Sequence, residues 1–464
     1  MARSEIVEQD LKCCSEETQK YVAAIEFENA VFKARLSQNS SNSNRPPSTD
    51  IKKNIPNNRE KSGKKSGGQP GREASNLEMV QNPDKTIIHK LPNICPHCLK
   101  KIVKAIIQDY EKRQEFDIPE PSPLVVTEHR AEVGLCEHCG KTIRAEFPKT
   151  ISAPTQYGSN IQARAVYANQ YQLIPYKRTV ELLEIFFGVR ISEGAIAEWN
   201  KKMYDALQPM EELIKQKIMK ARLIHADETS VRIDKKPHWI HLTSTEFLTL
   251  FNLHKERSIK ALMDIGILPN YSGTVVHDAY KMYFHFSFTH ALCNAHNCRE
   301  LKGIFENDSL QWAKNMKEFL CKMNDEKCES QIPFSKKIKI EASKKLDEII
   351  EAAEKETPKN TIRNDTKRGK IKQSKARNML DRCIDFKDAI LRFIFVFLVP
   401  FDNNQGERDF RMAKVHQKIS GCFRSLEGAL YFCRIRSCIS TAKKNKMEVL
   451  KLLSDALTGN PIIF

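Results

Sequence analysis

The pattern of hydrophobic and polar positions divides the chain into helical segments around a stranded centre. Helical spacing of apolar residues covers 159–206, returns at 298–400 and continues to the C-terminal end. Between these segments, short runs rich in apolar and β-branched residues predict strands, namely RLIHAD, HWIHLTST, FLTLFNLH and GTVVHDAY. The pattern predicts a multidomain protein of mixed α+β and α/β class.

A further helix is predicted at 11–37, followed by a polar linker. The helix has heptad-like apolar spacing and a polar Asn29 at a position that can set the register of a coiled coil. The pattern covers about two heptads, so a short helix packed on its own chain explains it equally well. The linker, which includes SQNSSNSNRPPSTD and KSGKKSGGQPGRE, is basic and expected to be flexible. It could lie along DNA phosphates or be a solvated tether.

Charge narrows the classes of partner. The 464 residues suggest roughly two to four domains, and the net charge of +17 favours a polyanion such as DNA. The longest apolar run, Phe393 to Pro400, is too short to cross a membrane, and the polar start from Met1 to Asp10 is not a signal peptide. The 14 cysteines are therefore expected to be reduced thiols or metal ligands of a cytoplasmic, nucleoid-associated protein.

Four cysteines form two Cys-x-x-Cys pairs, Cys95 with Cys98 and Cys136 with Cys139. Together they supply the four thiolates that a tetrahedral structural Zn²⁺ prefers. Gly140 follows the second pair, where a tight turn benefits from a residue without Cβ. A dithiol redox motif is the alternative, but it would require a thioredoxin-like strand and helix around one pair. The sequence predicts structural zinc in this segment.

The segment TVELLEIFFGVRISEGAIAEWNKKM predicts two helices separated by a break at Gly188. Ser192 is a suitable N-cap for the second helix. This arrangement fits a helix-turn-helix, whose second helix enters the major groove, and Lys201 and Lys202 would supply charge close to the DNA backbone. An ordinary helical hairpin in a bundle has the same pattern, so both interpretations stay open.

Three carboxylates occur in settings that suit metal chemistry. Asp227 and Asp278 each end an apolar strand, so they could converge if the two strands are adjacent. Asn404 and Glu407 fit a capping box, which places Glu407 in the first turn of a helix. Two strand aspartates and a helix glutamate are what a ribonuclease-H-like site with two Mg²⁺ or Mn²⁺ ions requires. Alternatively, Glu407 only caps its helix and the aspartates lie in turns.

Several motifs in a fixed order resemble the transposases of the insertion sequence sixty-six family. They include GGQPGRE, CPHC with CEHC, HADETSVR, VVHDAY, CNAH, DNNQGERDFRMAK and KISGCFRS, and they extend from about residue 45 to 455. The resemblance implies an N-terminal helix at 1–38, a linker at 39–84, a zinc-ribbon-like domain at 85–150, a helix-turn-helix region at 151–215 and a ribonuclease-H-like core at 216–455 with a helical insertion at 298–400.

The resemblance also implies a function and the residues that perform it. The protein would bind the terminal inverted repeats of an insertion sequence and, as a DDE transposase, cut and join DNA through Asp227, Asp278 and Glu407. It would act as a homo-oligomer on two element ends and target DNA, with accessory proteins of the same element as further partners. Other matching residues would support the active site (Cys293 and His296) or contact DNA phosphates (Arg408, Arg411 and Arg424), unless they only pack or are solvated. A catalytically inactive DNA-binding remnant is the alternative, and a nuclease that does not join DNA is another.

Overall fold

The structure is a computed structural model that describes residues 150–188, 190–360, 371 and 373–460, with scattered residues between 14 and 148. The chain divides into two compact units. The central sheet and the candidate site belong to the unit that comprises the described residues of 1–53, 126–185 and 189–464. No helix in the described part of the chain is both long and apolar enough to cross a lipid bilayer.

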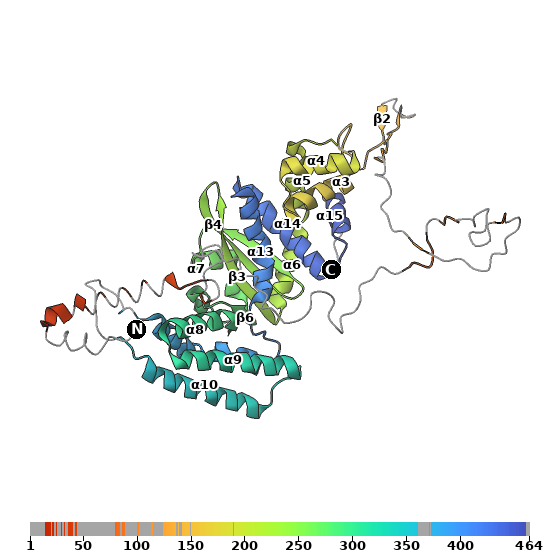
Figure 1. Cartoon of the computed structure of the whole chain (residues 1–464). Helices are drawn as coiled ribbons and strands as arrows, with labels where there is room; N and C mark the ends of the chain where they lie inside the picture. Colours follow the sequence, from red (N-terminus) through yellow and green to blue (C-terminus); the bar gives the residue numbers. More distant parts are fainter. Residues whose placement is uncertain are drawn as a thin grey trace. The chain divides into compact units, whose positions relative to one another are not determined.

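A five-stranded mixed sheet lies at the centre of this unit, with strand order β5-β4-β3-β6-β7 (Figure 1). The strands are β3 (Leu223–Ile233), β4 (Lys236–Ser244), β5 (Thr249–His254), β6 (Thr274–His277) and β7 (Thr289–Leu292). β3, β4 and β5 pair antiparallel, whereas β6 and β7 run parallel to β3. The four predicted strands are confirmed, and β7 is an additional one.

Helices before and after the sheet share one hydrophobic core with it. They are α3 (Ser159–Val166), a π-helical turn (Tyr167–Tyr171), α4 (Tyr176–Phe187), α5 (Glu193–Ala206), α6 (Gln208–Lys220), α14 (Leu426–Lys444) and α15 (Val449–Thr458). Ala163 and Ala165 are fully buried, since small side chains allow α3 to approach α5 and α15 closely. Trp199 and Met203 of α5 face the same core as Ile224 of β3.

The predicted helical insertion lies between β7 and α13 (Asn404–Ser420), and its helices share a second hydrophobic core with β6 and β7. It contains α8 (Asn294–Asp308), α9 (Gln311–Ser330), α10 (Lys336–Glu356), α11 (Lys375–Asp385) and α12 (Lys387–Phe395). Its centre is the fully buried Trp312, whose Nε1 donates to Thr357 Oγ1 at 2.9 Å. A short α7 (Ile259–Ile265) connects β5 to β6.

The helix that carries Glu407, α13, packs on β3 and β4, and α14 packs on β5 (Figure 1). Phe410 of α13 meets Phe251 of β5, with ring centroids 5.9 Å apart. Beyond α13, Phe423 adds a short parallel bridge to Ile233 at the end of β3. These contacts hold α13 and the segment that follows it against the antiparallel half of the sheet.

The described residues before 149 include helical positions and a two-stranded sheet. Those between 16 and 36 are helical, and Asn42 Nδ2 donates to Glu306 Oε2 of α8 at 3.1 Å. Two short strands, β1 (Val133–Leu135) and β2 (Thr142–Arg144), pair antiparallel. The predicted zinc ligands Cys95, Cys98, Cys136 and Cys139 lie outside the described residues.

Candidate active site

The pairing of β3 with β6 brings Asp227 and Asp278 together. The register aligns Leu223 with Thr274 and His225 with Val276. Continued by two residues, it sets Asp278, the first residue after β6, opposite Asp227. The expectation that Asp227 ends its strand is wrong, because β3 continues to Ile233 in a hairpin with β4. The two aspartates lie side by side because β6 ends next to the middle of β3, which continues beyond that point.

Both aspartates are partly buried among like charges. Burial raises the pKa of Asp227 well above its ordinary value, and Glu228, Asp278 and Glu407 raise it further. Burial, and then Glu228, raise the pKa of Asp278 to about 6. Asp227 Oδ1 accepts a bond from the Glu228 N–H (2.8 Å) and Asp278 Oδ1 from the Tyr280 N–H (2.9 Å). Neither carboxylate forms an ion pair with any lysine, arginine or histidine that the structure describes, so no cation contacts the two aspartates directly.

Glu407 lies in the first turn of α13, as predicted. Its Oε1 is 3.4 Å from Arg299 Nη2 and 3.7 Å from His296 Nε2, and its side chain is 41% exposed. The predicted capping box is wrong. The N-cap is Asn403, which makes no side-chain capping bond, and Asn404 Nδ2 donates to Asp402 instead.

Asn403 fixes the start of α13 beside the aspartates. It is 2% exposed, and its Nδ2 donates to the carbonyl of Ala226, the residue before Asp227, at 3.0 Å. Its Oδ1 accepts a bond from His225 Nδ1 at 2.7 Å. A buried amide with all these bonds made is costly to displace, because any movement would leave polar groups unpaired. Asn403 thereby sets how near Glu407 comes to β3.

Cys293 and His296, which the resemblance assigned to active-site support, are the N-cap and a first-turn residue of α8, next to the start of α13. Cys293 Sγ is 3.1 Å from the Asn403 N–H and 3.2 Å from His296 Nδ1. Burial raises the pKa of the Cys293 thiol to about 11, so it stays protonated at neutral pH. Burial and the nearby Arg299 lower the pKa of His296 to about 4, so the imidazole is neutral. The pair adds hydrogen bonds to the site without adding charge.

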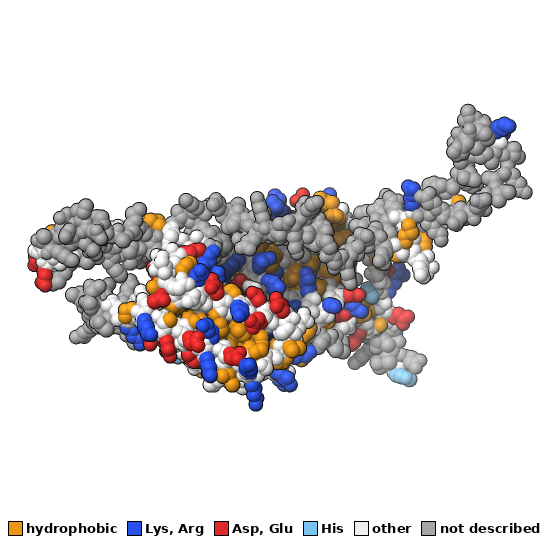
Figure 2. Space-filling model, turned by 60° about the horizontal axis from the view of Figure 1, so that its bottom comes forward, with side chains coloured by type: hydrophobic (Ala, Val, Ile, Leu, Met, Phe, Trp, Pro, Cys, Tyr) orange, Lys and Arg blue, Asp and Glu red, His pale blue; other side chains and the backbone are white. Residues whose placement is uncertain are grey.

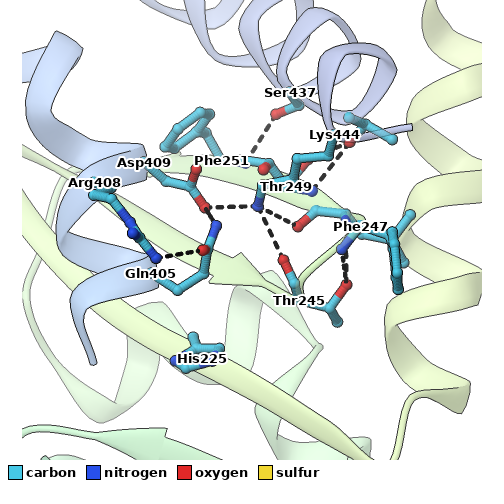
Figure 3. A network of polar contacts seen from close by, with 12 residues as sticks. His225, Thr245, Phe247, Thr249, Phe251, Gln405, Arg408, Asp409, Ser437 and Lys444 are labelled. Atoms are coloured by element: carbon cyan, nitrogen blue, oxygen red, sulfur yellow. Dashed lines mark hydrogen bonds and ion pairs between the residues drawn. The ribbon is translucent and has the colours of Figure 1, made fainter. Parts of the chain in front are cut away.

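A buried ion pair fixes the second turn of α13 (Figure 3). Lys444 of α14 donates to Asp409 Oδ2 at 2.8 Å, and to the carbonyls of Thr245 and Leu248 at 3.0 Å each. The Lys444 and Asp409 side chains are only 14% and 12% exposed. One ammonium group therefore joins α13, α14 and the β4–β5 turn. Sequence reasoning missed this pair, whose partners are far apart in the chain.

Sequence reasoning also missed a fourth acid, Glu228, next to Asp227. Its carboxylate is 2% exposed and pairs with Arg257, whose Nε donates at 2.8 Å. The Tyr283 hydroxyl also donates to it. The Arg257 guanidinium in turn stacks 3.9 Å above the Tyr280 ring. Glu228 therefore already has a cation, unlike its two aspartate neighbours. The only signal in the sequence was its position after Asp227.

The two helices predicted for the helix-turn-helix candidate, and the break between them, are confirmed. α4 ends before Gly188, which has a left-handed φ of +64°, and Ser192 Oγ accepts the Ala195 N–H bond that caps α5 at 3.1 Å. Lys201 and Lys202 are exposed on α5, opposite its buried face. On and after α13 the further DNA-contact candidates Arg408, Arg411 and Arg424 are also exposed.

Basic and acidic side chains are mixed on the described residues of α9 and α10 in the insertion. Figure 2 shows acidic and basic side chains interspersed on the described surface of one face. On α9 and α10, lysines pair with glutamates one turn away, as in Lys322–Glu326 (3.8 Å) and Lys337–Glu341 (4.0 Å). Paired charges of this kind release few counterions from DNA. The exposed arginines near Glu407 and the lysines of α5 are better placed for phosphates.

The fold and the site define a mixed α/β protein whose central sheet gathers carboxylates from two parallel strands next to a helix that carries a third. The model of a family described as Transposase IS66 family matches residues 154–431, a range that includes Asp227, Asp278 and Glu407. The chain therefore belongs to the IS66 family of transposases, which confirms the family indicated by its motifs. No curated protein matches the chain.

Proposed function

We propose that the chain is a DDE transposase that binds the terminal inverted repeats of an insertion sequence and cuts and joins DNA at Asp227, Asp278 and Glu407. The observation that carries the proposal is the register of β3 and β6, which sets the two aspartates side by side. Asn403 then ties the helix of Glu407 to the same strand. The strand order, with an antiparallel half and a parallel half, supports the ribonuclease-H-like assignment.

The residues fit a pair of Mg²⁺ or Mn²⁺ ions. Carboxylate oxygens are the ligands that these hard cations prefer, and the partial burial and raised pKa values of the two aspartates favour positive charge there. Among the described residues, no three acidic, histidine or cysteine side chains are already arranged to hold a metal. Glu407 would have to exchange Arg299 and His296 for metal. When bound, two such ions would stabilise the charge that develops on the attacking and leaving oxygens of a phosphodiester.

The residues around the carboxylates keep the site in shape. Asn403 and the pair of Asp409 with Lys444 hold α13, and the neutral Cys293 and His296 fill the space between α8 and Glu407. Neutral partners suit this position, because a thiolate there would add to the repulsion and an imidazolium would compete with the metal.

The other modules are proposed to bind DNA. A structural Zn²⁺ held by Cys95, Cys98, Cys136 and Cys139 fits the paired strands β1 and β2, whose connection contains the second cysteine pair. The exposed Lys201, Lys202, Arg408, Arg411 and Arg424 would contact phosphates. A homo-oligomer spanning two element ends, accessory proteins of the element and a location at the nucleoid complete the proposal.

The test is to incubate the purified protein with labelled element-end DNA and target DNA in Mg²⁺, beside Asp278→Asn. Cleaved ends and joined products that the variant does not form would support the proposal. Cleavage without joining would indicate a nuclease. End-specific binding without cleavage in Mg²⁺ or Mn²⁺, even with accessory proteins added, would indicate a DNA-binding remnant.

A further inference from the structure

We propose that Arg299 binds a phosphate of the DNA at the active site, and that Glu407 holds Arg299 until a metal ion takes the carboxylate. The inference rests on the proposed function and adds a DNA-contact residue to it. Arg299 belongs to no motif noted in the sequence, and its position in the fold is what identifies it.

The first turn of α8 is fixed against the start of α13. The Asn294 N–H donates to the Phe401 carbonyl at 2.9 Å, and Cys293 Sγ accepts the Asn403 N–H at 3.1 Å. His296 and Arg299 are three residues apart on α8, so they share one face. That face meets Glu407, which places the Arg299 guanidinium beside a proposed metal ligand.

The Arg299 guanidinium is only weakly held. Its Nη2 is 3.4 Å from Glu407 Oε1, its Nε is 3.4 Å from the Ala295 carbonyl, and the structure shows no acceptor for Nη1 within its described part. A third of the side chain is exposed. Long, solvent-exposed pairs of this type contribute little, so Arg299 could change partners readily.

Arg382, another arginine near the site, is held much more firmly than Arg299. Arg382 Nη1 donates to Glu300 Oε2 at 2.8 Å, and both side chains are about three-quarters buried. Arg382 is therefore committed to a structural ion pair. Arg299 instead depends on a carboxylate that the metal would claim. Once that carboxylate is shared with a metal, Arg299 needs another anion, and the phosphate bound at the metals is the nearest one that DNA would supply. The planar fork of arginine suits two phosphate oxygens.

The test measures the salt dependence of binding to element-end DNA by the full chain. We expect Arg299→Gln to reduce the slope of log affinity against log salt concentration by about 0.9 in Ca²⁺, and to leave it unchanged without divalent cations. Lys302→Gln is the matched control, since it removes one charge a turn further along α8, where Lys302 pairs with Glu306. It should change neither slope, and Arg299→Lys should retain most of the wild-type slope.

The second part of the test measures DNA binding by the metal-free protein. Glu407→Gln should free Arg299, so that the metal-free protein binds DNA with a slope steeper by about 0.9, and Arg299→Gln in the same chain should remove this gain. A gain of equal size with and without Arg299 would overturn the inference. A second result would also overturn the inference. If Arg299→Gln leaves the salt dependence of DNA binding in Ca²⁺ unchanged but weakens Mn²⁺ binding, Arg299 only supports Glu407. A wild-type protein that binds no DNA would overturn both the proposed function and this inference.

Discussion

Replacing Asp278 by asparagine should stabilise the metal-free protein at neutral pH while abolishing DNA cleavage. The carboxyl has a pKa of about 6 in the folded protein, against an ordinary value of 3.8, because it is buried near Glu228. A carboxyl whose pKa is raised on folding stabilises the fold fully below its ordinary pKa, and this contribution is lost as the pH rises through about 6. At pH 7.5 the charged group therefore opposes folding. Asparagine removes the charge and can still accept the bond from the Tyr280 N–H.

The difference between the two pKa values sets the size of the effect. At about 1.4 kcal/mol for each tenfold change in proton affinity, the penalty reaches about 3 kcal/mol at pH 7.5 and falls below about 1 kcal/mol at pH 4. An unfolding entropy of roughly 2 cal/mol/K per residue gives a unit of nearly 400 residues about 1–1.5 °C of melting temperature per kcal/mol. We therefore expect Asp278→Asn to melt about 3–5 °C higher than wild type at pH 7.5, and within about 1 °C of it at pH 4.

Thermal unfolding of both proteins at the two pH values, with and without Mg²⁺, measures this directly. Mg²⁺ should raise the melting temperature of the wild type at pH 7.5 and have little effect on the variant, since bound cations stabilise only the protein that holds them. The reasoning is refuted if the variant melts at or below the wild-type temperature at pH 7.5 without metal. In that case the Asp278 carboxylate would already be well solvated or paired.

Three other substitutions test the supports of the site. Lys444→Met leaves the Asp409 carboxylate buried without its cation and should lower the free energy of unfolding by about 3 kcal/mol, measured by urea denaturation. A loss below about 1 kcal/mol would mean that the ion pair contributes no more than an exposed one. Asn403→Ala removes the hydrogen bonds to His225 and Ala226 and should slow cleavage of element-end DNA at least tenfold while DNA affinity is retained. Equal losses of cleavage rate and DNA affinity would contradict a role confined to positioning α13. Ser192→Ala should cost about 1 kcal/mol and speed amide hydrogen exchange at the start of α5, and unchanged exchange would argue against the cap.

The elements of the fold were predictable where the pattern was local. Four strands, the helices on both sides of the sheet and the Ser192 cap all follow from short-range signals. The length of β3 did not, because its hairpin turns at Asp234 and Lys235, which both adopt positive φ without the usual glycine or asparagine. β7 has four residues, as β6 does, but its THAL lacks the two valines that mark the TVVH of β6 as a strand.

The candidate site was predictable only in part, because contacts between residues distant in the sequence form it. A strand ending in aspartate can be recognised from the sequence, but its neighbour in the sheet cannot, because parallel pairing joins distant segments. The two most buried ion pairs near the site, Glu228 with Arg257 and Asp409 with Lys444, join residues 29 and 35 positions apart. No local pattern marks such pairs, since each member looks like an ordinary surface charge until the chain folds. The zinc ligands remain a prediction.

The charge partners of the acids explain which of them suits a metal. Glu228 is 2% exposed and bound by Arg257 and Tyr283, so a metal could recruit this buried carboxylate only by displacing both partners. Glu407 is 41% exposed and has only a long contact to Arg299 and a neutral histidine. Giving up those partners would cost roughly 1 kcal/mol or less. Asp227 and Asp278 have no cationic partner to give up among the described residues. On energetic grounds Glu407 is therefore a better candidate than Glu228 for the proposed third ligand, even though Glu228 is adjacent to Asp227 in the sequence.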